Sequence, residues 1–296
     1  MIGAHLVADG IGRFAHRYDD DLIVDLIAQA ASRALLQEIA TWPKPGLVSD
    51  VDNGSHRDMD ASMLRASVHT LQPYFAELAQ AGRAQAGMTS LRSIGVRAEV
   101  AMLAATGGVN THRGAIFGLG LLCAAAGATA RLAAGGRLVT PPRLGRIVAQ
   151  RWGHAIQRGP IPLHSHGAAA LRRHGAGGAR AEAISGFRSI YEIGLPALRQ
   201  GRVVVQNNAT AASVQACFAL IAAVEDTNLL HRGGCEGARY AAAAAAAFIA
   251  QGGLGAPDWR ARAAAVHAGF VDRNLSPGGC ADLLAMTLFV DALEAT

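Results

Sequence analysis

The stretch ATGGVNTHRGAIFGLGLLCAAAG, residues 105–127, changes character in its middle. Its first part holds two adjacent glycines and then a block of four polar residues, Asn110, Thr111, His112 and Arg113. Nearly everything from Gly114 onward is apolar, as in a membrane span or a helix buried in a protein core. The run is built on Ala and Gly rather than Leu and Ile, and Arg131 follows it closely. We therefore predict a buried core helix that carries a polar loop at its start.

Helical periodicity dominates the rest of the chain. Apolar residues recur at helical spacing after the acidic residues 19–21, which favours a helix that begins there. Further helices are expected at residues 58–81, 89–106, 142–157, 179–193, 209–224, 237–251, 258–270 and 281–293. Only RVVVQ, residues 202–206, resembles a strand, and it is short enough to be the lead-in to a helix. The sequence predicts an all-α protein: a single compact multi-helix domain over residues 19–296 with polar active-site loops at helix ends, preceded by an N-terminal extension, residues 1–18, of unclear role.

Composition narrows the class of protein. The 296 residues are 51% hydrophobic and 17% charged, which allows a substantial core. The four cysteines are widely spaced, and the N-terminus lacks the pattern of a secretory signal, so we expect free thiols and a cytoplasmic protein without a membrane span. The net charge of +5 suits anionic partners. Nucleic acid is not expected among them, because the arginines are dispersed and no basic block occurs.

The first polar cluster is PKPGLVSDVDNGSHRDMD, residues 43–60. Lys44 lies between two prolines, which restrict the backbone, and His56 and Asp58 follow in a His-x-Asp pair. This arrangement is typical of a phosphate and metal site. Asp60 is explained equally well by the N-terminal turn of the next helix.

The second cluster is a polar stripe. Arg92, Glu99 and Thr106 recur every seven residues and so share roughly one helix face, which leads into the loop before Gly114. Because the neighbours of Glu99 are apolar, we expect a partly desolvated carboxylate. The alternative is a structural ion pair between Arg92 and Glu99. In the loop, the glycines allow close approach to a ligand, and free N–H groups at the helix start favour an anion.

Two further clusters lie near the C-terminus. EDTNLLHRGG, residues 225–234, contains Asp226, Asn228, His231 and Arg232. SPGGCADLLA, residues 276–285, contains Ser276, Gly278, Gly279 and Asp282. Asp282 is also explained by the preference for acidic residues in a first helical turn. Carboxylates beside basic groups suit a nucleotide with Mg²⁺, yet neither a P-loop nor a GxGxxG motif occurs in the sequence.

These segments together resemble the triphosphoribosyl-dephospho-CoA synthase family. The resemblance rests on PKPGLVSDVDNGSHRDMD, on LRSIGVRAEVAMLAATGGVNTHRGAIFGLGLL, on GARAEAISGF, on EDTNLLHRGG and on SPGGCADLLAMTLF, in this order from about Glu38 to Phe289. The chain departs from the family pattern in having Arg113 where the family has lysine and Ser55 where it has alanine. An arginine keeps the charge without the geometry of lysine, which weakens the case for a direct catalytic role at residue 113.

The resemblance implies a transfer reaction. ATP and 3′-dephospho-CoA would give 2′-(5″-triphosphoribosyl)-3′-dephospho-CoA and adenine. The product would pass to a phosphoribosyl-dephospho-CoA transferase, which loads the acyl carrier protein of malonate decarboxylase or citrate lyase. The Ala- and Arg-rich composition favours the malonate system. An Ala-rich helical protein of this size is also compatible with a homodimer.

The expected reaction assigns roles to the polar residues. Breaking the bond between ribose and purine passes through an oxocarbenium-like state, as in glycoside cleavage. Glu99 is the predicted general base or oxocarbenium stabiliser, and His112 the acid or purine contact. The predicted substrate- and phosphate-binding residues are Lys44, Arg92, Asn110, Thr111, Arg113, Asn228, His231, Arg232, Ser276, Gly278 and Gly279. The predicted Mg²⁺ ligands are His56, Asp58, Asp226 and Asp282.

Two other functions fit the same residues. A Mg²⁺-dependent hydrolase of nucleotide or ADP-ribose-type N- or O-glycosidic bonds would need the same carboxylates, and it would release adenine without dephospho-CoA. A non-catalytic helical partner of an acyl carrier subunit would not need polar residues at so many helix boundaries.

Overall fold

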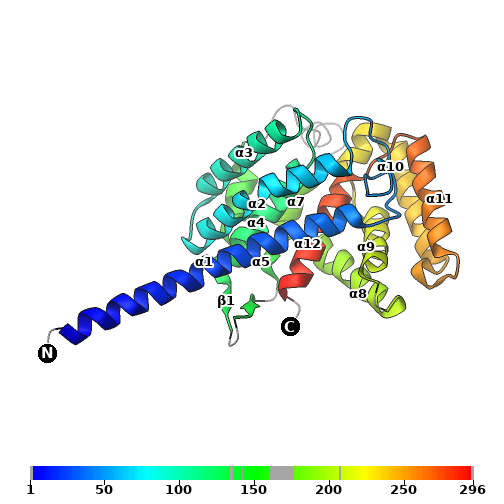
Figure 1. Cartoon of the computed structure of the whole chain (residues 1–296). Helices are drawn as coiled ribbons and strands as arrows, with labels where there is room; N and C mark the ends of the chain where they lie inside the picture. The colour runs from blue at the N-terminus through cyan, green and yellow to red at the C-terminus, as the bar shows by residue number, and fades with distance from the viewer. Residues whose placement is uncertain (1–2, 134–135, 142, 161–176, 207, 295–296) are drawn as a thin grey trace.

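The computed structural model describes residues 3–133, 136–141, 143–160, 177–206 and 208–294, with residues 3–18 described as backbone. Helices make up almost all of it (Figure 1). They are α1 (Gly3–Ala40), α2 (Ala61–Arg83), α3 (Met88–Ala105), α4 (Arg113–Thr129), α5 (Leu144–Arg158), α7 (Gly178–Ile184), the π-helix η1 (Ile190–Gly194), α8 (Leu195–Val204), α9 (Ala209–Ala223), α10 (Thr227–Ala250), the 3₁₀-helix η2 (Gly253–Gly255), α11 (Trp259–Asp272) and α12 (Gly278–Glu294). Strands β1 (Arg131–Leu132) and β2 (Leu138–Val139) form a small antiparallel hairpin with Arg131 opposite Val139. The predicted all-α class is confirmed.

Helix α4 lies at the centre, packed against α2 and α12. Its residues are buried almost without interruption from Ala115 to Gly127. Its small side chains let α2 approach so closely that a Cβ added at Gly127 would overlap the carbonyl of Ala79. The Ala and Gly that distinguish this run from a membrane span thus serve close helix packing, and the predicted core helix is confirmed.

Among the described residues, no single helix is long and apolar enough to cross a membrane. Helices α9 and α10 reach that length and composition only when taken together, and they are bent by 59° at the break between them.

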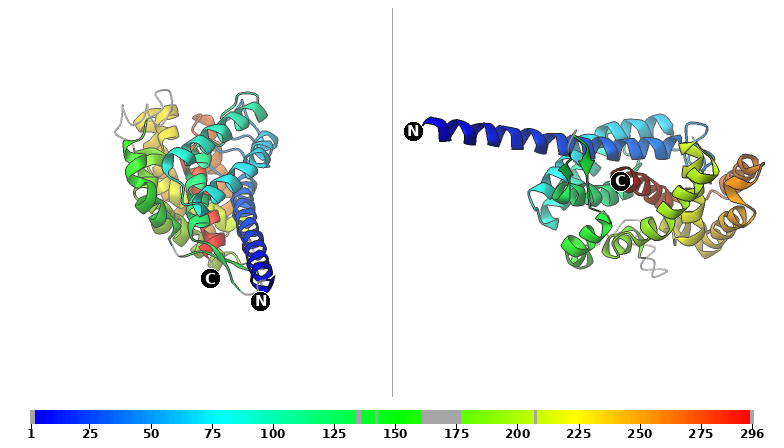
Figure 2. Two further views of the ribbon diagram at one scale, coloured as in Figure 1. Left: turned by 90° about the vertical axis from the view of Figure 1, so that its left-hand side faces the viewer. Right: turned by 90° about the horizontal axis from the view of Figure 1, so that it is seen from below.

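Helix α1 begins sixteen residues before the predicted start. It runs without a break from Gly3 to Ala40, so the expectation that residues 19–21 begin a helix is wrong. No proline interrupts the preceding residues, and the acidic run lies within the helix instead of at its end. Figure 2 shows the first turns of α1 extending beyond the other helices. The second half packs on α2 and α12 through buried residues such as Ile27 and Leu35.

Three other boundaries differ from the prediction. The strand-like residues 202–206 fall at the C-terminal end of α8, with Val203 exposed. The helix expected at 179–193 is divided into α7 and η1, because Gly186 and Phe187 both adopt positive φ. Helix α10 begins at Thr227 and not at residue 237, and it contains a break at Gly234. Pro142, the expected start of the next helix after α4, lies outside the described residues.

Candidate active site

Lys44 is buried at the point where the chain leaves α1. It is only 1% exposed, and its ammonium group forms an ion pair with Glu38 from the last turns of α1. The backbone of the loop is fixed as well, since His267 Nδ1 donates to the Lys44 carbonyl at 2.7 Å and His267 Nε2 lies 3.1 Å from Asp52 Oδ1. The predicted phosphate ligand is therefore already paired inside the protein.

Glu38 was not predicted as a site residue. Burial raises the pKa of its carboxyl group, and the charge of Lys44 opposes this rise. The sequence held a signal for it, because Ala31, Leu35 and Glu38 lie at positions i, i+4 and i+7 of one helix face, and the first two are core residues. A charged residue on an otherwise buried face needs a partner.

His112 is the N-terminal cap residue of α4, and it is 5% exposed. Its Nδ1 lies 2.8 Å from the hydroxyl of Ser67 on α2, and Thr111 Oγ1 donates to the same hydroxyl at 2.9 Å. Burial, and secondarily the charge of Lys44, lowers the pKa of His112 to about 4. The imidazole is therefore neutral at pH 7, which favours a hydrogen-bonding contact over the role of a charged acid.

Asp282 meets the start of α4 from just beyond the first turn of α12, so the alternative of an acidic residue in the first helical turn is wrong. A Cβ at Gly114 would overlap its Oδ2 atom, so the close approach requires glycine there. The backbone N–H of Ala115 donates to the carboxyl group. Burial, and then the negative charges of Glu38 and Asp226, raise its pKa well above the ordinary value. Among the described residues, Asp282 is thus a carboxyl group whose pKa is raised by the charges of two other carboxylates.

Asp226 is buried and serves as the N-cap of α10. Its Oδ1 accepts hydrogen bonds from the backbone N–H groups of Asn228 and Leu229, at 2.7 and 3.2 Å. Its Oδ2 accepts from Cys280 N in α12 at 2.8 Å, where a Cβ at Gly279 would lie 3.0 Å away. Burial raises the pKa of Asp226, and these hydrogen bonds oppose the rise. The carboxylate therefore joins α10 to α12.

Glu99 lies nearer the surface than predicted. Its side chain is 31% exposed, which agrees with partial desolvation, but the neighbouring Val96 and Val100 are exposed and do not surround it with core. Val96 and Val100 suggested apolar surroundings for Glu99 in the sequence, but both valines lie on the outer face of α3. Glu99 pairs with Arg113 and not with Arg92, so the alternative ion pair is wrong. The Arg92 guanidinium lies beside Gly159 at the end of α5, close to Arg180.

The loop of residues 43–60 is fastened to the turn before α12. His56 Nε2 lies 2.9 Å from Ser276 Oγ, and the Arg232 guanidinium contacts His56 and donates to the carbonyls of Ser55 and Asn274. Burial, followed by the charge of Arg232, lowers the pKa of His56. Much of the hydrogen-bonding capacity of Arg232 therefore holds this loop in place.

The remaining predicted residues border the same helix starts. Asn110 Oδ1 accepts from Arg113 N at 3.2 Å, and Asn228 Nδ2 lies 2.9 Å from the position that a Cβ of Gly278 would take. His231 is exposed. The polar segments therefore converge at the starts of α4, α10 and α12 and the end of α1, with Glu99 and Arg113 at the edge and Arg92 at the end of α5.

The four predicted metal ligands do not form a metal centre built by the protein. In the part of the chain that the structure describes, no three His, Cys, Asp or Glu side chains are arranged to hold a metal ion. Asp58 is 62% exposed and faces His56, whereas both oxygens of Asp226 accept backbone hydrogen bonds. The donors present therefore do not fit a resident Mg²⁺ ion.

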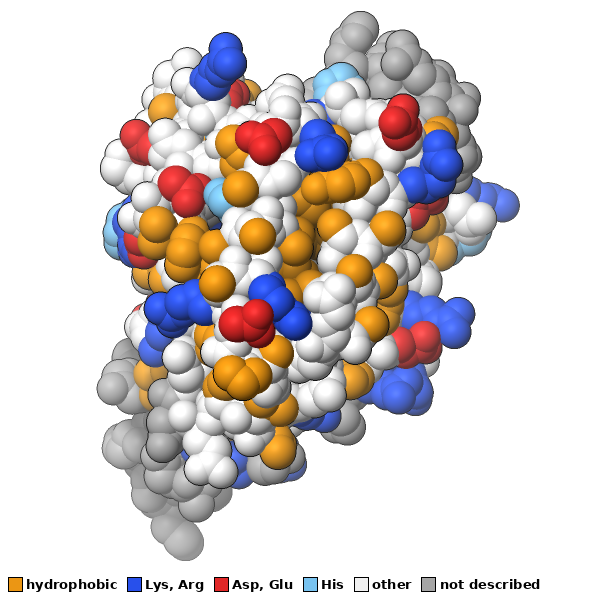
Figure 3. Space-filling view, turned by 90° about the vertical axis from the view of Figure 1, so that its right-hand side faces the viewer, with side chains coloured by type: hydrophobic (Ala, Val, Ile, Leu, Met, Phe, Trp, Pro, Cys, Tyr) orange, Lys and Arg blue, Asp and Glu red, His pale blue; other side chains and the backbone are white. Residues whose placement is uncertain are grey.

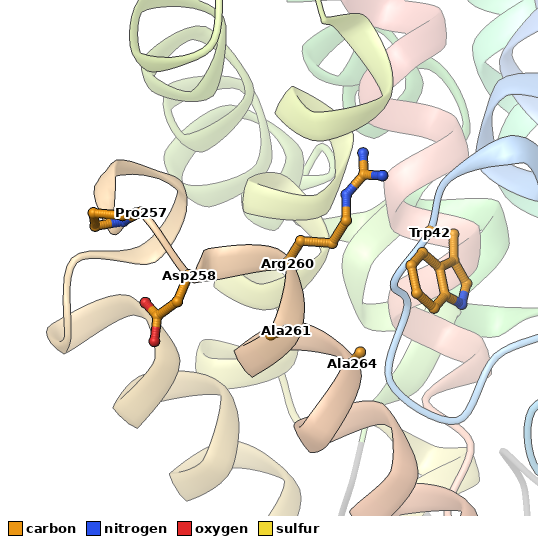
Figure 4. Close-up of a pocket in the computed structure, with 6 residues that line it drawn as sticks. All are labelled: Trp42, Pro257, Asp258, Arg260, Ala261 and Ala264. Carbon is orange, nitrogen blue, oxygen red and sulfur yellow. The ribbon is translucent and has the colours of Figure 1, made fainter.

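A surface hollow lies apart from these residues. It is lined by Trp42, Pro257, Asp258, Arg260, Ala261 and Ala264 (Figure 4). Figure 3, which views the side of the molecule where α11 lies, shows acidic and basic side chains dispersed among apolar ones. The residues that line the hollow include none of the predicted catalytic residues, so the buried cluster remains the candidate active site.

Comparison with known proteins identifies the family. The family model described as ATP:dephospho-CoA triphosphoribosyl transferase matches residues 24–296. The chain belongs to this family. It is therefore an enzyme, a ribosyl transferase of the triphosphoribosyl-dephospho-CoA synthase type.

Curated relatives agree over nearly the whole chain. The 2-(5″-triphosphoribosyl)-3′-dephosphocoenzyme-A synthase of Pectobacterium atrosepticum is 40% identical, with 97% of this chain and 94% of the relative covered. The probable synthases of Azotobacter vinelandii and Acinetobacter calcoaceticus are 38% and 36% identical, with 92% of this chain and 92% and 91% of the relatives covered. No solved structure shows significant similarity to the enzyme. The resemblance expected from the five sequence segments is confirmed.

Proposed function

We propose that the enzyme moves the triphosphoribosyl group of ATP to the 2′-hydroxyl of 3′-dephospho-CoA and releases adenine. The observation that carries this proposal is the convergence of Glu38, Lys44, His112, Asp226 and Asp282, which interact electrostatically or by hydrogen bonds within one buried cluster. Such a cluster offers a carboxyl group of raised pKa beside a neutral imidazole. Cleavage of a ribose–purine bond with transfer to a hydroxyl needs both a proton acceptor and a hydrogen-bond donor.

Asp282 is the better candidate for the general base. A raised pKa brings a carboxyl group closer to the pH at which it exchanges protons with substrate. Asp226 is occupied by three backbone donors, and Glu38 is paired with Lys44, so neither is as well placed to accept the hydroxyl proton. Glu99, the base expected from the sequence, instead holds Arg113 at the edge of the site.

The triphosphate is held rather than cleaved in this reaction. Arg113 begins α4 and is 44% exposed, so its guanidinium can reach a phosphate group beside the free N–H groups of that helix. Asn110, Thr111 and Ser276 supply further polar groups, and Gly278 and Gly279 allow close backbone approach at the start of α12. Lys44 contributes from inside the protein: burial and, secondarily, the charge of Lys44 keep His112 neutral, and the same ammonium group balances Glu38.

In this proposal Mg²⁺ binds to the enzyme as a complex with ATP. Mg²⁺ keeps several water ligands and binds through few carboxylates together with substrate phosphates. A Mg²⁺–ATP complex therefore needs no three-residue centre of the kind that the described residues lack. We assign the metal to the phosphates of ATP and derive no step from a protein-bound ion.

The product would serve a carrier protein. We propose the malonate decarboxylase system, on the composition of the chain alone, with a phosphoribosyl-dephospho-CoA transferase and an acyl carrier protein acting downstream in the cytoplasm. A homodimer belongs to the same proposal.

An assay of adenine release tests the reaction. The purified enzyme with ATP, Mg²⁺ and 3′-dephospho-CoA is expected to release adenine without forming ADP or phosphate. Chromatography of the reaction mixture measures these products.

Asp282→Asn should lower kcat by about 10²-fold or more, the scale expected for loss of a general base. Asp291→Asn is the matched control, since Asp291 is a buried carboxylate of the same helix that pairs with Arg202. Adenine release without dephospho-CoA would instead favour a glycosidic hydrolase, and ADP formation would contradict the proposed chemistry.

A further inference from the structure

Ser67 lies in the middle of α2, fully buried, and between two residues of the loop before α4. Thr111 Oγ1 donates to Ser67 Oγ at 2.9 Å, and Ser67 Oγ lies 2.8 Å from His112 Nδ1. These two hydrogen bonds form a short chain that ends on the imidazole ring. No feature of the sequence marked Ser67, because a serine in an amphipathic helix is an ordinary residue.

This pair of hydrogen bonds favours one position for the proton of the His112 ring. A serine hydroxyl has one proton to donate, and here it accepts the proton of Thr111. Its own proton is then available for His112 Nδ1, 2.8 Å away, with that nitrogen as the acceptor. In a neutral imidazole the proton then resides on Nε2, and the tautomer is set by the partner of the other nitrogen.

We propose that Ser67 is a positioning residue that holds His112 as the Nε2–H tautomer, so that this N–H points a hydrogen bond at the departing purine. The part concerning the purine rests on the proposed function, whereas the tautomer does not. The surroundings of the ring agree with this geometry, since burial and, secondarily, the charge of Lys44 disfavour a second proton on the ring.

The atoms balance without a protonated histidine. The bond between ribose C1 and the purine nitrogen breaks, and its electron pair leaves with the purine. The 2′-oxygen of dephospho-CoA forms the new bond to C1, while its proton passes to Asp282. The Nε2–H of His112 donates a hydrogen bond to the purine as negative charge develops there, and the adenine finally takes up the proton that the hydroxyl lost. A donor aimed at developing charge stabilises the transition state more than the ground state.

Nitrogen NMR of the full-length ¹⁵N-histidine-labelled enzyme tests the tautomer without substrates. The His112 signals are assigned by their loss in His112→Gln. We expect Nδ1 to show the shift of an unprotonated acceptor and Nε2 that of an N–H group from pH 6 to pH 8. A proton on Nδ1 in the unmodified enzyme would overturn the proposal, and this readout does not depend on any variant folding or on adenine release.

Ser67→Ala tests the positioning. It should shift the His112 signals toward a mixture of tautomers and lower kcat about tenfold, a loss that corresponds to one hydrogen bond, with KM for ATP nearly unchanged. Ser67→Thr keeps the hydroxyl and should keep the Nε2–H signature. Ser213→Ala is the control, since Ser213 is a fully buried helical serine that bonds Ala209 and Gln37. Unchanged His112 signals in Ser67→Ala would overturn the role of Ser67, and changed signals with an unchanged kcat would overturn the purine contact.

Discussion

At the scale of single residues, the surface ion pair between Glu99 and Arg113 has a close counterpart in the pair between Glu77 and Arg97. Exposed pairs contribute about 0.2–1 kcal/mol. If Glu99 only orients Arg113, Glu99→Gln should raise KM for ATP by about fivefold at most and leave kcat nearly unchanged. Steady-state kinetics checks this, with Glu77→Gln as the matched control. A fall in kcat of about 10²-fold would restore Glu99 as the general base.

The depressed pKa of His112 makes stability depend on pH. The unfolded chain binds a proton at this residue below about pH 6.5, whereas the folded protein does so only below about pH 4. The neutral imidazole therefore adds its full contribution to the free energy of unfolding above pH 6.5. About 3 kcal/mol of this contribution is lost as the pH falls to 4. Urea unfolding at several pH values gives the free energy of unfolding of the enzyme and of His112→Gln. Subtracting one from the other isolates the contribution of His112, because the buried carboxyl groups, whose effect on stability has the opposite pH dependence, are present in both proteins. Parallel pH profiles would contradict the assignment.

The sequence located much of the site but did not show which residues surround Glu99. Lys44, His112, Asp226 and Asp282 could be placed together because each interrupts an apolar pattern at a helix boundary. Glu99 was misjudged because apolar neighbours along a helix do not show which face packs against the core. Ser67 was missed because its significance depends on a partner 45 residues away, which no local pattern reveals. Glu38 was overlooked although it interrupts a core face of α1, and its partner Lys44 lies beyond the end of that helix.

At the scale of elements, α4 and α12 meet through two glycines that differ in what they contact. A Cβ at Gly114 would overlap the Asp282 carboxylate, whereas one at Gly118 would meet the flexible side chain of Met286. Gly114→Ala should therefore displace Asp282 and lower kcat by about 10²-fold. Gly118→Ala should keep kcat and cost about 1–3 kcal/mol of stability through overpacking. Kinetics and urea unfolding of both variants check the contrast, which would fail if the two lost activity equally.

Most helices followed from periodicity, but α8 was not predicted, and helix ends depended on interactions outside each segment. Helix α10 starts at Thr227 because Asp226 caps it and also binds Cys280 of α12, a contact that spans 54 residues. The break at Gly234, with φ of 60° and ψ of −162°, made the later residues look like a separate helix. Residues 202–206 were ambiguous because β-branched valines on an exposed helix end resemble a strand.

At the scale of the whole molecule, the ion pair of Glu38 and Lys44 ties the end of α1 to the loop that crosses toward α12. Both side chains are buried, so removing one partner leaves a charge without compensation. Lys44→Met should therefore lower the free energy of unfolding by about 3–5 kcal/mol, measured by urea denaturation at pH 7. The double variant Glu38→Leu with Lys44→Met removes both charges and should regain most of that loss while remaining inactive. A double variant as unstable as Lys44→Met would show that the methylene packing of the lysine, and not charge balance, holds this junction together.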